Sequence, residues 1–306
     1  MNLEEIKLIL ENHPLARDID AISLSFIDFN NLSSQDFTFI SNGQKLSLDD
    51  QKIFYDLASV TKPLTIGFIQ FIASELLKET MFKLLLNHES GIPPWGLLSK
   101  NNWQEQISNY EINRSDVVYS DFGALRSQIE FEKITSKNLY DECSILWDKE
   151  IVHWSEVDPN MCLKTGERGF RPIVGDVHDP NAWVIKNKVS HAGLFGTITG
   201  MNNTLMELEK KFKICDYFLS QMKGQKKTRF INAWDSVEDK THTLAGNHCG
   251  DYTVGHLGFT GTGFWIDCQK KVGVVILSNA TRDGWYRKVN LNDVRKKIGN
   301  LLWTNK

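Results

Sequence analysis

Residues 59–77 place the strongest constraint on what this chain can fold into. Apolar side chains point in almost every direction around a helix drawn through this stretch, and a helix that is apolar on all sides is buried. The sequence therefore predicts a helix at the centre of the protein, with the other elements packed around it. The apolar side chains are those of Leu64, Ile66, Phe68, Ile69, Phe71, Ile72 and Leu76.

The predicted central helix has a defined start. Pro63 lacks an N–H group, so it is tolerated only in the first turn of a helix, where that group has no partner. This requirement places Ser59 at or next to the helix N-terminus. The apolar stretch is too short to span a bilayer, and it carries the polar residues Gln70 and Glu75.

Both ends of the chain carry strand patterns, in which apolar and polar residues alternate or short apolar runs stop at turn residues. The predicted strands are residues 22–26, 37–40, 252–257, 263–267 and 272–278. A short polar turn joins the last two of these strands into a hairpin. Helical spacing predicts a helix that ends near His13 and another, over residues 291–301, that closes the chain.

Strands from both ends that enclose a largely helical middle predict an α+β fold. We expect an antiparallel sheet of five or more strands, contributed by both chain ends and flanked by helices, with an inserted, mainly helical subdomain. The chain is interpreted as a single domain, 1–306. Its α/β part comprises residues 1–58 and 225–306, and its mainly helical part comprises residues 59–224.

The composition excludes several classes of function. The 306 residues are 41% hydrophobic and 24% charged, which are ordinary values for a globular protein. A net charge of −3 without long runs of one sign argues against a nucleic-acid interface. Five cysteines without a CxxC pair fit a reducing compartment, and residues 1–7 lack the pattern of a secretory signal. We therefore expect a cytoplasmic protein with no nucleic-acid or membrane partner.

The first candidate for chemistry is the pair Ser59 and Lys62. Residues three apart share one face of a helix, so the lysine amine can reach the serine hydroxyl. A hydroxyl becomes a strong nucleophile only when a neighbouring base accepts its proton. The Ser-x-x-Lys pattern alone is weak, because Ser220 and Lys223 match it as well, with no buried helix behind them.

Further segments resemble the motifs of the serine β-lactamase and penicillin-binding-protein superfamily, in particular class C β-lactamases and their esterase and peptidase relatives. Residues 56–63 (DLASVTKP) are similar to the first motif and residues 118–123 (VYSDFG) to the second, Tyr-x-Asn or Tyr-Ser-Asp. Residues 256–262 (HLGFTGT) are similar to the third, Lys-Thr-Gly or His-x-Gly. The resemblance covers residues 54–280 and also includes 85–93 (LLNHESGIP), 175–182 (GDVHDPNA), 191–195 (HAGLF), 264–267 (FWID) and 274–279 (VVILSN).

This resemblance, and with it a β-lactamase/transpeptidase-like fold, implies roles for particular residues. Ser59 would be acylated, and Lys62 would take its proton as the general base. Tyr119 would contact both and relay a proton to the leaving group. His256 would either complete the hydrogen-bond network or bind a substrate carboxylate. The backbone N–H groups of Ser59 and Phe259 would form the oxyanion hole.

The same resemblance implies substrate-binding roles for Asp121, Gly258, Thr260 and His191. Two positions depart from the pattern of the β-lactamases. Leu257 stands where many relatives have a threonine, whose hydroxyl often binds the carboxylate of a β-lactam or peptide. Asp121 replaces an asparagine, and its carboxylate would favour the charged form of Lys62. Both departures weaken the case for β-lactamase activity itself.

Several other polar residues have two interpretations. His178, Asp179 and His191 are spaced unlike any standard set of metal ligands, so we interpret them as loop scaffolding and expect no metal or cofactor. Arg168 and Arg171 either grip a substrate anion or have an ordinary structural role.

The sequence thus predicts a serine hydrolase that forms an acyl-Ser59 intermediate on an ester, an amide or a D-amino-acid-containing peptide. The substrate would be a small molecule or a short peptide, and the oligomeric state is left open. One alternative is a non-catalytic β-lactamase-like binding or regulatory protein. Another is a DD-carboxypeptidase or a β-lactamase proper.

Overall fold

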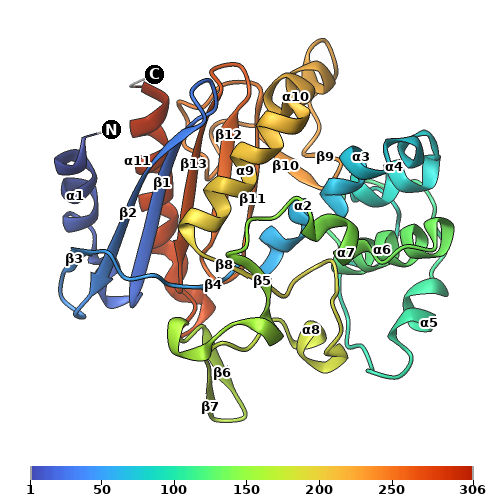
Figure 1. The fold of residues 1–306 in the computed structure, drawn as a ribbon, viewed down its shortest axis with the longest axis horizontal. Coiled ribbons are helices and arrows are strands. Elements are labelled where there is room, and N and C mark those ends of the chain that lie inside the picture. The colour runs from blue at the N-terminus through green and yellow to red at the C-terminus, as the bar shows by residue number, and fades with distance from the viewer. Residues whose placement is uncertain (1, 305–306) are drawn as a thin grey trace.

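A computed structural model describes residues 2–304 of the chain, and its central element is a large antiparallel sheet (Figure 1). In spatial order the strands are β3 (Leu46–Asp49), β2 (Ser33–Ser41), β1 (Ala21–Asp28), β13 (Val272–Ser278), β12 (Gly263–Asp267), β11 (Thr253–Leu257), β10 (Trp234–Ser236) and β9 (Phe230–Ile231). Strands from the two chain ends meet at the centre, where β1 pairs with β13 from Ile22↔Ser278 to Asp28↔Val272. The predicted α+β fold and its sheet are confirmed. The predicted outer boundaries, residues 1 and 306, lie outside the described residues.

Helices cover both faces of this sheet, which explains why β1 and β13 are buried on both faces (Figure 1). One face packs against α1 (Leu3–Glu11) and α11 (Lys288–Thr304), with Ile22, Leu24 and Phe26 in the shared core. The other face packs against α9 (Ile198–Phe212) and α10 (Ile214–Met222). Because the sheet is enclosed, β13 is apolar on successive residues, whereas β1 alternates apolar residues with the buried hydroxyls of Ser23 and Ser25.

Most of the remaining elements lie between β3 and β9 in the sequence. The helices are α2 (Thr61–Leu64), α3 (Ile69–Ile72), α4 (Thr80–Leu86), α5 (Trp103–Ser108), α6 (Asp121–Thr135), α7 (Leu139–Ser144) and α8 (Pro180–Ile185). One small sheet joins β4 (Tyr55–Asp56), β8 (Leu194–Gly196) and β5 (Ile151–His153), and a second joins β6 (Gly166–Arg168) and β7 (Arg171–Ile173). The 3-10 turns η2 (Ala58–Val60), η3 (Ile66–Phe68) and η4 (Ser74–Lys78) separate the first helices. Others are η1 (Pro14–Arg17), η5 (Trp154–Glu156), η6 (Pro159–Met161) and η7 (Trp285–Arg287).

The predicted central helix over residues 59–77 is buried as expected, but its continuity is wrong. The segment is a succession of short turns, η2, α2, η3, α3 and η4. Thr65 leaves the helical conformation (φ −120°, ψ −88°), and its Oγ1 donates to the carbonyls of Thr61 and Ser190, both at 2.8 Å. A hydroxyl that competes for backbone carbonyls breaks a helix that the apolar pattern alone would continue.

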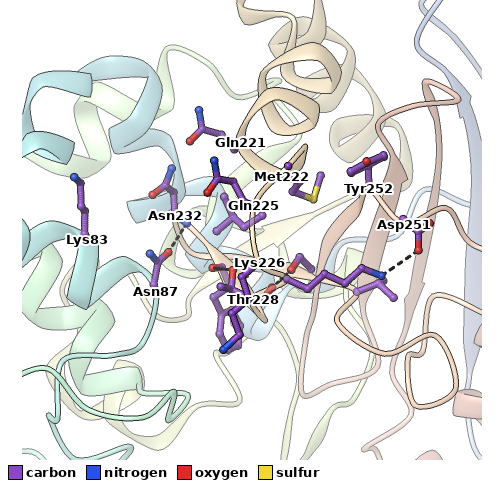
Figure 2. Close-up of a pocket in the computed structure, with 16 residues that line it drawn as sticks. Lys83, Asn87, Gln221, Met222, Gln225, Lys226, Thr228, Asn232, Asp251 and Tyr252 are labelled. Atoms are coloured by element: carbon purple, nitrogen blue, oxygen red, sulfur yellow. Dashed lines mark hydrogen bonds and ion pairs between the residues drawn. The ribbon is translucent and has the colours of Figure 1, made fainter.

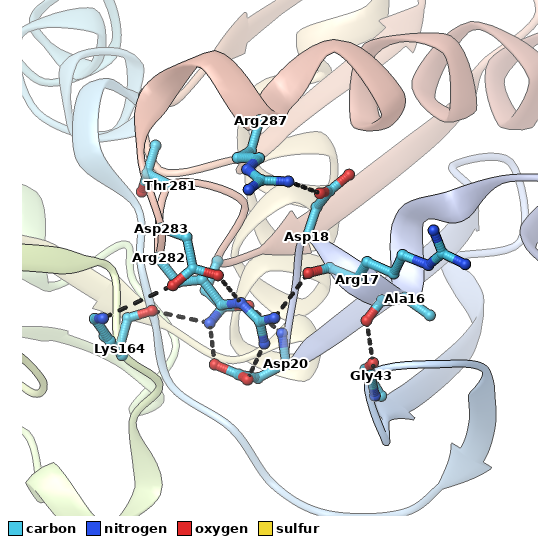
Figure 3. Close-up of polar contacts among 12 residues, drawn as sticks. Ala16, Arg17, Asp18, Asp20, Gly43, Lys164, Thr281, Arg282, Asp283 and Arg287 are labelled. Atoms are coloured by element: carbon cyan, nitrogen blue, oxygen red, sulfur yellow. Dashed lines mark hydrogen bonds and ion pairs between the residues drawn. The ribbon is translucent and has the colours of Figure 1, made fainter.

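A partly buried polar cluster ties the two chain ends to the inserted region (Figure 3). Arg282 pairs with Asp20 and donates to the Arg17 carbonyl at 2.8 Å. Beside them, Asn279 accepts the Asp20 N–H at 2.9 Å and donates to the Lys164 carbonyl at 2.9 Å. Asn279 therefore satisfies partly buried backbone groups from two distant segments.

Asn279→Ala is expected to destabilise the protein by about 1–3 kcal/mol, because it leaves two partly buried backbone groups without this partner. Urea denaturation followed by circular dichroism measures this change. Asn203→Ala is the matched control, since Asn203 makes its side-chain hydrogen bond at the exposed surface, and we expect a change within about 0.5 kcal/mol. Equal stabilities of the two variants would contradict the assigned role of Asn279.

Candidate active site

Ser59 lies in the turn η2, directly after the strand β4. Ala58, which precedes it, has a left-handed backbone (φ +47°), a conformation that costs energy for any residue except glycine. The buried Asp56 carboxylate holds this turn by accepting the Ala58 N–H at 2.8 Å and the His178 N–H at 2.7 Å. Burial, opposed by these hydrogen bonds, raises the pKa of Asp56 to about 7. The strained turn leaves the Ser59 side chain half-exposed, as a nucleophile requires.

Lys62 is fully buried, and its Nζ lies 3.1 Å from the Ser59 Oγ. The ammonium also pairs with Asp121 at 2.7 Å and donates to the His191 carbonyl at 2.9 Å. Burial lowers the pKa of Lys62, but Asp121 and Tyr119 outweigh burial, so the pKa lies above its ordinary value. In the resting protein Lys62 is therefore charged and donates a hydrogen bond to the nucleophile.

Tyr119 lies between the rings of His88, Phe230 and His256, with centroids 4.8, 5.8 and 5.9 Å away. Its hydroxyl is buried beside Lys62 and makes no hydrogen bond of good geometry within residues 2–304. Burial raises the pKa of Tyr119 although Lys62 acts in the opposite direction. The phenol therefore keeps its proton at neutral pH.

His256 on β11 offers a hydrogen-bond acceptor to the site. Its Nδ1 lies 2.9 Å from the Leu257 carbonyl, a contact that requires a proton on Nδ1. Burial and the charge of Lys62 lower the pKa of His256 to about 3. The buried Nε2 then carries a lone pair and has no partner among the described residues. This geometry favours a place in the hydrogen-bond network over the binding of a carboxylate, which would need a donor.

The turn between β11 and β12 carries Phe259, whose N–H donates to no acceptor within residues 2–304. The turn is tied to the nucleophile segment, because Thr260 Oγ1 donates to the Asp56 carbonyl at 2.6 Å and Thr262 Oγ1 to the Leu57 carbonyl at 3.0 Å. A Cβ on Gly258 would lie 2.5 Å from the Leu57 carbonyl oxygen, so only glycine fits there. Thr260 is fully buried and its hydroxyl holds the turn, so it does not face a substrate.

Other residues singled out in the sequence have structural contacts. The imidazole of His88 accepts the Ser120 N–H at 3.1 Å and so pins the segment that carries Tyr119. Arg168 pairs with Asp176 at 3.0 Å and stacks over the Trp183 ring, which favours the structural interpretation of this arginine.

Two cavities flank Ser59 and share Ser59, Tyr119 and Phe259 in their walls. The first, which we call the acidic cavity, has a volume of about 390 Å³. Its other lining residues are Ala58, Trp95, Asp121, His178, Asp179, Pro180, His191 and Ala192. The second, the basic cavity, has a volume of about 290 Å³. Its other lining residues are Arg229, Phe230, Asp235, Leu244, His256, Leu257, Gly258, Lys288, Asn292 and Arg295.

The cations of the basic cavity were missed in the sequence. Arg295 is only 5% exposed. It donates hydrogen bonds to Asn292 at 3.1 Å and to the Thr262 carbonyl at 2.6 Å, and its Nε has no partner within residues 2–304. Lys288 donates to the Phe259 carbonyl at 2.9 Å, and burial together with Arg295 lowers its pKa to about 8. Their spacing in the sequence places both residues on one face of the closing helix. That spacing does not show which part of the protein the face contacts.

A larger cavity of about 590 Å³ lies between α4, α10 and β9 (Figure 2). Lys83, Asn87 and Tyr252 are among its lining residues, and it shares only Phe230 with the basic cavity. It contains none of the predicted site residues, which gather instead around Ser59.

Comparisons with known proteins show the fold of the chain. No protein-family model and no curated protein sequence matches it. A class C β-lactamase from Rhodobacter sphaeroides superposes with a TM-score of 0.64 at 13% identity, over 99% of this chain and 100% of that chain. The D-amino acid amidase from Ochrobactrum anthropi SV3, complexed with D-phenylalanine, gives 0.62 at 14% identity, over 97% and 99%. The octameric penicillin-binding protein homologue from Pyrococcus abyssi gives 0.62 at 14% identity, over 91% and 74%.

These likenesses confirm at the level of fold the resemblance seen in the motifs: the chain has the fold of the serine β-lactamases and penicillin-binding proteins. Within residues 2–304, no helix combines the length and the apolar character needed to cross a membrane.

Proposed function

We propose that the protein is a serine hydrolase that acts through an acyl-Ser59 intermediate. The observation that carries this proposal is the buried Lys62 ammonium, 3.1 Å from the Ser59 hydroxyl and beside the Tyr119 phenol, at the meeting point of two cavities. A protein that only binds a ligand gains nothing from burying a lysine against a serine, because burying a charge is costly. Proteins of the same fold include a β-lactamase, an amidase and the hydrolase EstCE1.

The proposed reaction begins when Lys62 loses a proton and accepts the one from Ser59, whose Oγ then attacks the substrate carbonyl. The N–H groups of Ser59 and Phe259 stabilise the developing oxyanion. Tyr119 supplies a proton to the departing group, and His256 Nε2 offers an acceptor for a hydrogen bond from the substrate. Water then attacks the acyl-Ser59 carbonyl and releases the acid.

The basic cavity supports a leaving group that bears a carboxylate. Arg295 is buried there and Lys288 is half-buried, and neither has a carboxylate partner among residues 2–304. Buried cations without such partners favour an anionic ligand, since a carboxylate would supply the missing hydrogen bonds. An amide or peptide whose leaving group is an amino acid meets this requirement.

Incubation of the protein with a fluorophosphonate is expected to add one phosphonyl group to Ser59. Intact mass measurement detects the adduct, and peptide mapping locates it. The adduct should be absent from Ser59→Ala and retained in Ser220→Ala, which alters the second Ser-x-x-Lys sequence on the exposed end of α10. A folded wild-type protein that gains no mass would refute the proposed function.

A further inference from the structure

The two cavities beside Ser59 carry opposite charge. The acidic cavity is lined by the carboxylates of Asp121 and Asp179 and by no lysine or arginine. The basic cavity is lined by three cations and one carboxylate, that of Asp235. A substrate that spans the nucleophile therefore meets negative groups on one side of its scissile bond and positive groups on the other.

Asp179 keeps one oxygen available in the acidic cavity. Its Oδ1 accepts from the Ala182 N–H at 2.8 Å and pairs with His191 Nε2 at 2.9 Å, whereas its Oδ2 has no hydrogen bond within residues 2–304. Burial raises the pKa of Asp179, but His191 and the Ala182 N–H outweigh burial and bring the pKa to about 2. The group is therefore an ionised carboxylate at neutral pH.

His191 provides a second, independent sign of a missing ligand. Its side chain is 1% exposed and lines the acidic cavity, yet its Nδ1 has no partner among the described residues. In the neutral imidazole, a proton on Nε2 that faces Asp179 leaves a lone pair on Nδ1. Asp179 Oδ2 is an acceptor, and so is His191 Nδ1 in this tautomer, so the ligand that suits them is a donor of several N–H groups.

The rest of the wall suits an apolar side chain next to that donor. Trp95, Tyr119 and Phe259 supply aromatic surface, and an ammonium group is attracted to the face of such rings. Both cavities lie near the low end of the roughly 300–1,000 Å³ range of small-molecule sites, so each accommodates a group of modest size.

We infer that the substrate is an unblocked dipeptide, with its α-ammonium group and first side chain in the acidic cavity and its C-terminal carboxylate in the basic cavity. This inference rests on the proposed acyl-Ser59 chemistry and adds the substrate class. In the first step the Ser59 Oγ–carbonyl bond forms and the peptide C–N bond breaks. The proton lost by Ser59 is taken up by Lys62, and Tyr119 protonates the departing nitrogen and is reprotonated from Lys62. Water then adds to the ester carbonyl, its proton returns to Ser59 Oγ, and the first amino acid is released.

The test compares Phe-Ala with N-acetyl-Phe-Ala at pH 7, each as the L,L and the D,D form, by measuring the alanine released. For the hydrolysed enantiomer, we expect kcat/KM of the free dipeptide to exceed that of the acetylated one by about tenfold or more, because acetylation removes the charge that Asp179 would bind. Asp179→Asn should lower this ratio about tenfold while keeping the cap of α8, since asparagine is an equally good N-cap. Asp116→Asn removes an equal charge from an exposed loop and should leave the ratio within about twofold.

The possible results distinguish a failure of the dipeptide inference from a failure of the proposed function. Three results would overturn the inference and leave the proposed hydrolase standing. They are equal rates for the free and acetylated dipeptides, an unchanged ratio in Asp179→Asn, and no dipeptide cleavage by a protein whose Ser59 reacts with the fluorophosphonate. If Ser59 does not react, calorimetric binding to Ser59→Ala decides the inference separately. Tighter binding of free than of acetylated dipeptide supports it, and the opposite order, or no binding of either, overturns it.

Discussion

Replacement of Lys62 by alanine is expected to slow the reaction of Ser59 with a fluorophosphonate by about 10²–10⁴-fold, the range that a positioned general base contributes. The reason is geometric, since the Lys62 amine lies 3.1 Å from the Ser59 hydroxyl, and within residues 2–304 Lys288 is the only lysine that lines either cavity. The rate of mass increase in intact protein measures the effect directly.

This prediction has a control within the same chain. Lys223→Ala removes the lysine of the second Ser-x-x-Lys sequence, which is exposed, and should leave the rate unchanged. Lys62→Ala also leaves the Asp121 carboxylate buried without its partner, which destabilises a protein. The double variant Lys62→Met with Asp121→Asn removes both charges and should react as slowly as the single variant. A folded double variant that reacts at the wild-type rate would show that Lys62 is not the base.

Asp121→Asn is expected to move the pH dependence of Ser59 acylation to lower pH by about 1–3 units, the size of the effect that an opposite charge in contact exerts on a pKa. Asp121 pairs with Lys62 at 2.7 Å and is the main cause that raises the pKa of Lys62 against the opposing effect of burial. Acylation requires neutral Lys62, so the wild-type rate should rise as the pH approaches this raised pKa. Without the carboxylate, burial lowers the pKa, and more Lys62 is neutral at pH 7.

The variant should therefore react at least about tenfold faster than the wild type near neutral pH, since one unit changes the neutral fraction tenfold. Rates measured from pH 6 to 10 give both profiles. Asp116→Asn changes the net charge equally but lies on an exposed loop, so its profile should match the wild type. An Asp121→Asn profile with the wild-type midpoint would mean that another group controls the pH dependence.

The sequence alone determined the parts of this protein that depend on local patterns. Ser59 and Lys62 are three residues apart, and a single turn of backbone suffices to bring their side chains together. The strands over residues 263–267 and 272–278 were predicted with the bounds that the structure shows, because each is a short apolar run that ends at turn residues. The order of the motifs correctly indicated the fold, and the assigned roles of Tyr119 and His256 remain predictions.

Local patterns failed where distant segments set the conformation. The apolar run over residues 59–77 predicted one helix, but the Thr65 hydroxyl bonds to the Ser190 carbonyl, 125 positions away, and the helix is broken there. The short strands β9 and β10 were not predicted, because a strand of two or three residues has too few positions to show a period.

Only the tertiary structure decided what surrounds the nucleophile. Arg295 and Lys288 come from the closing helix, and Asp179 and His191 come from a loop more than 80 residues before it in the sequence. Their opposite charges can act on the same ligand only because the fold places α11 on one side of Ser59 and the segment of Asp179 and His191 on the other. Electrostatic complementarity to a ligand depends on distances in space, whereas spacing along a chain reports only on neighbours within one element.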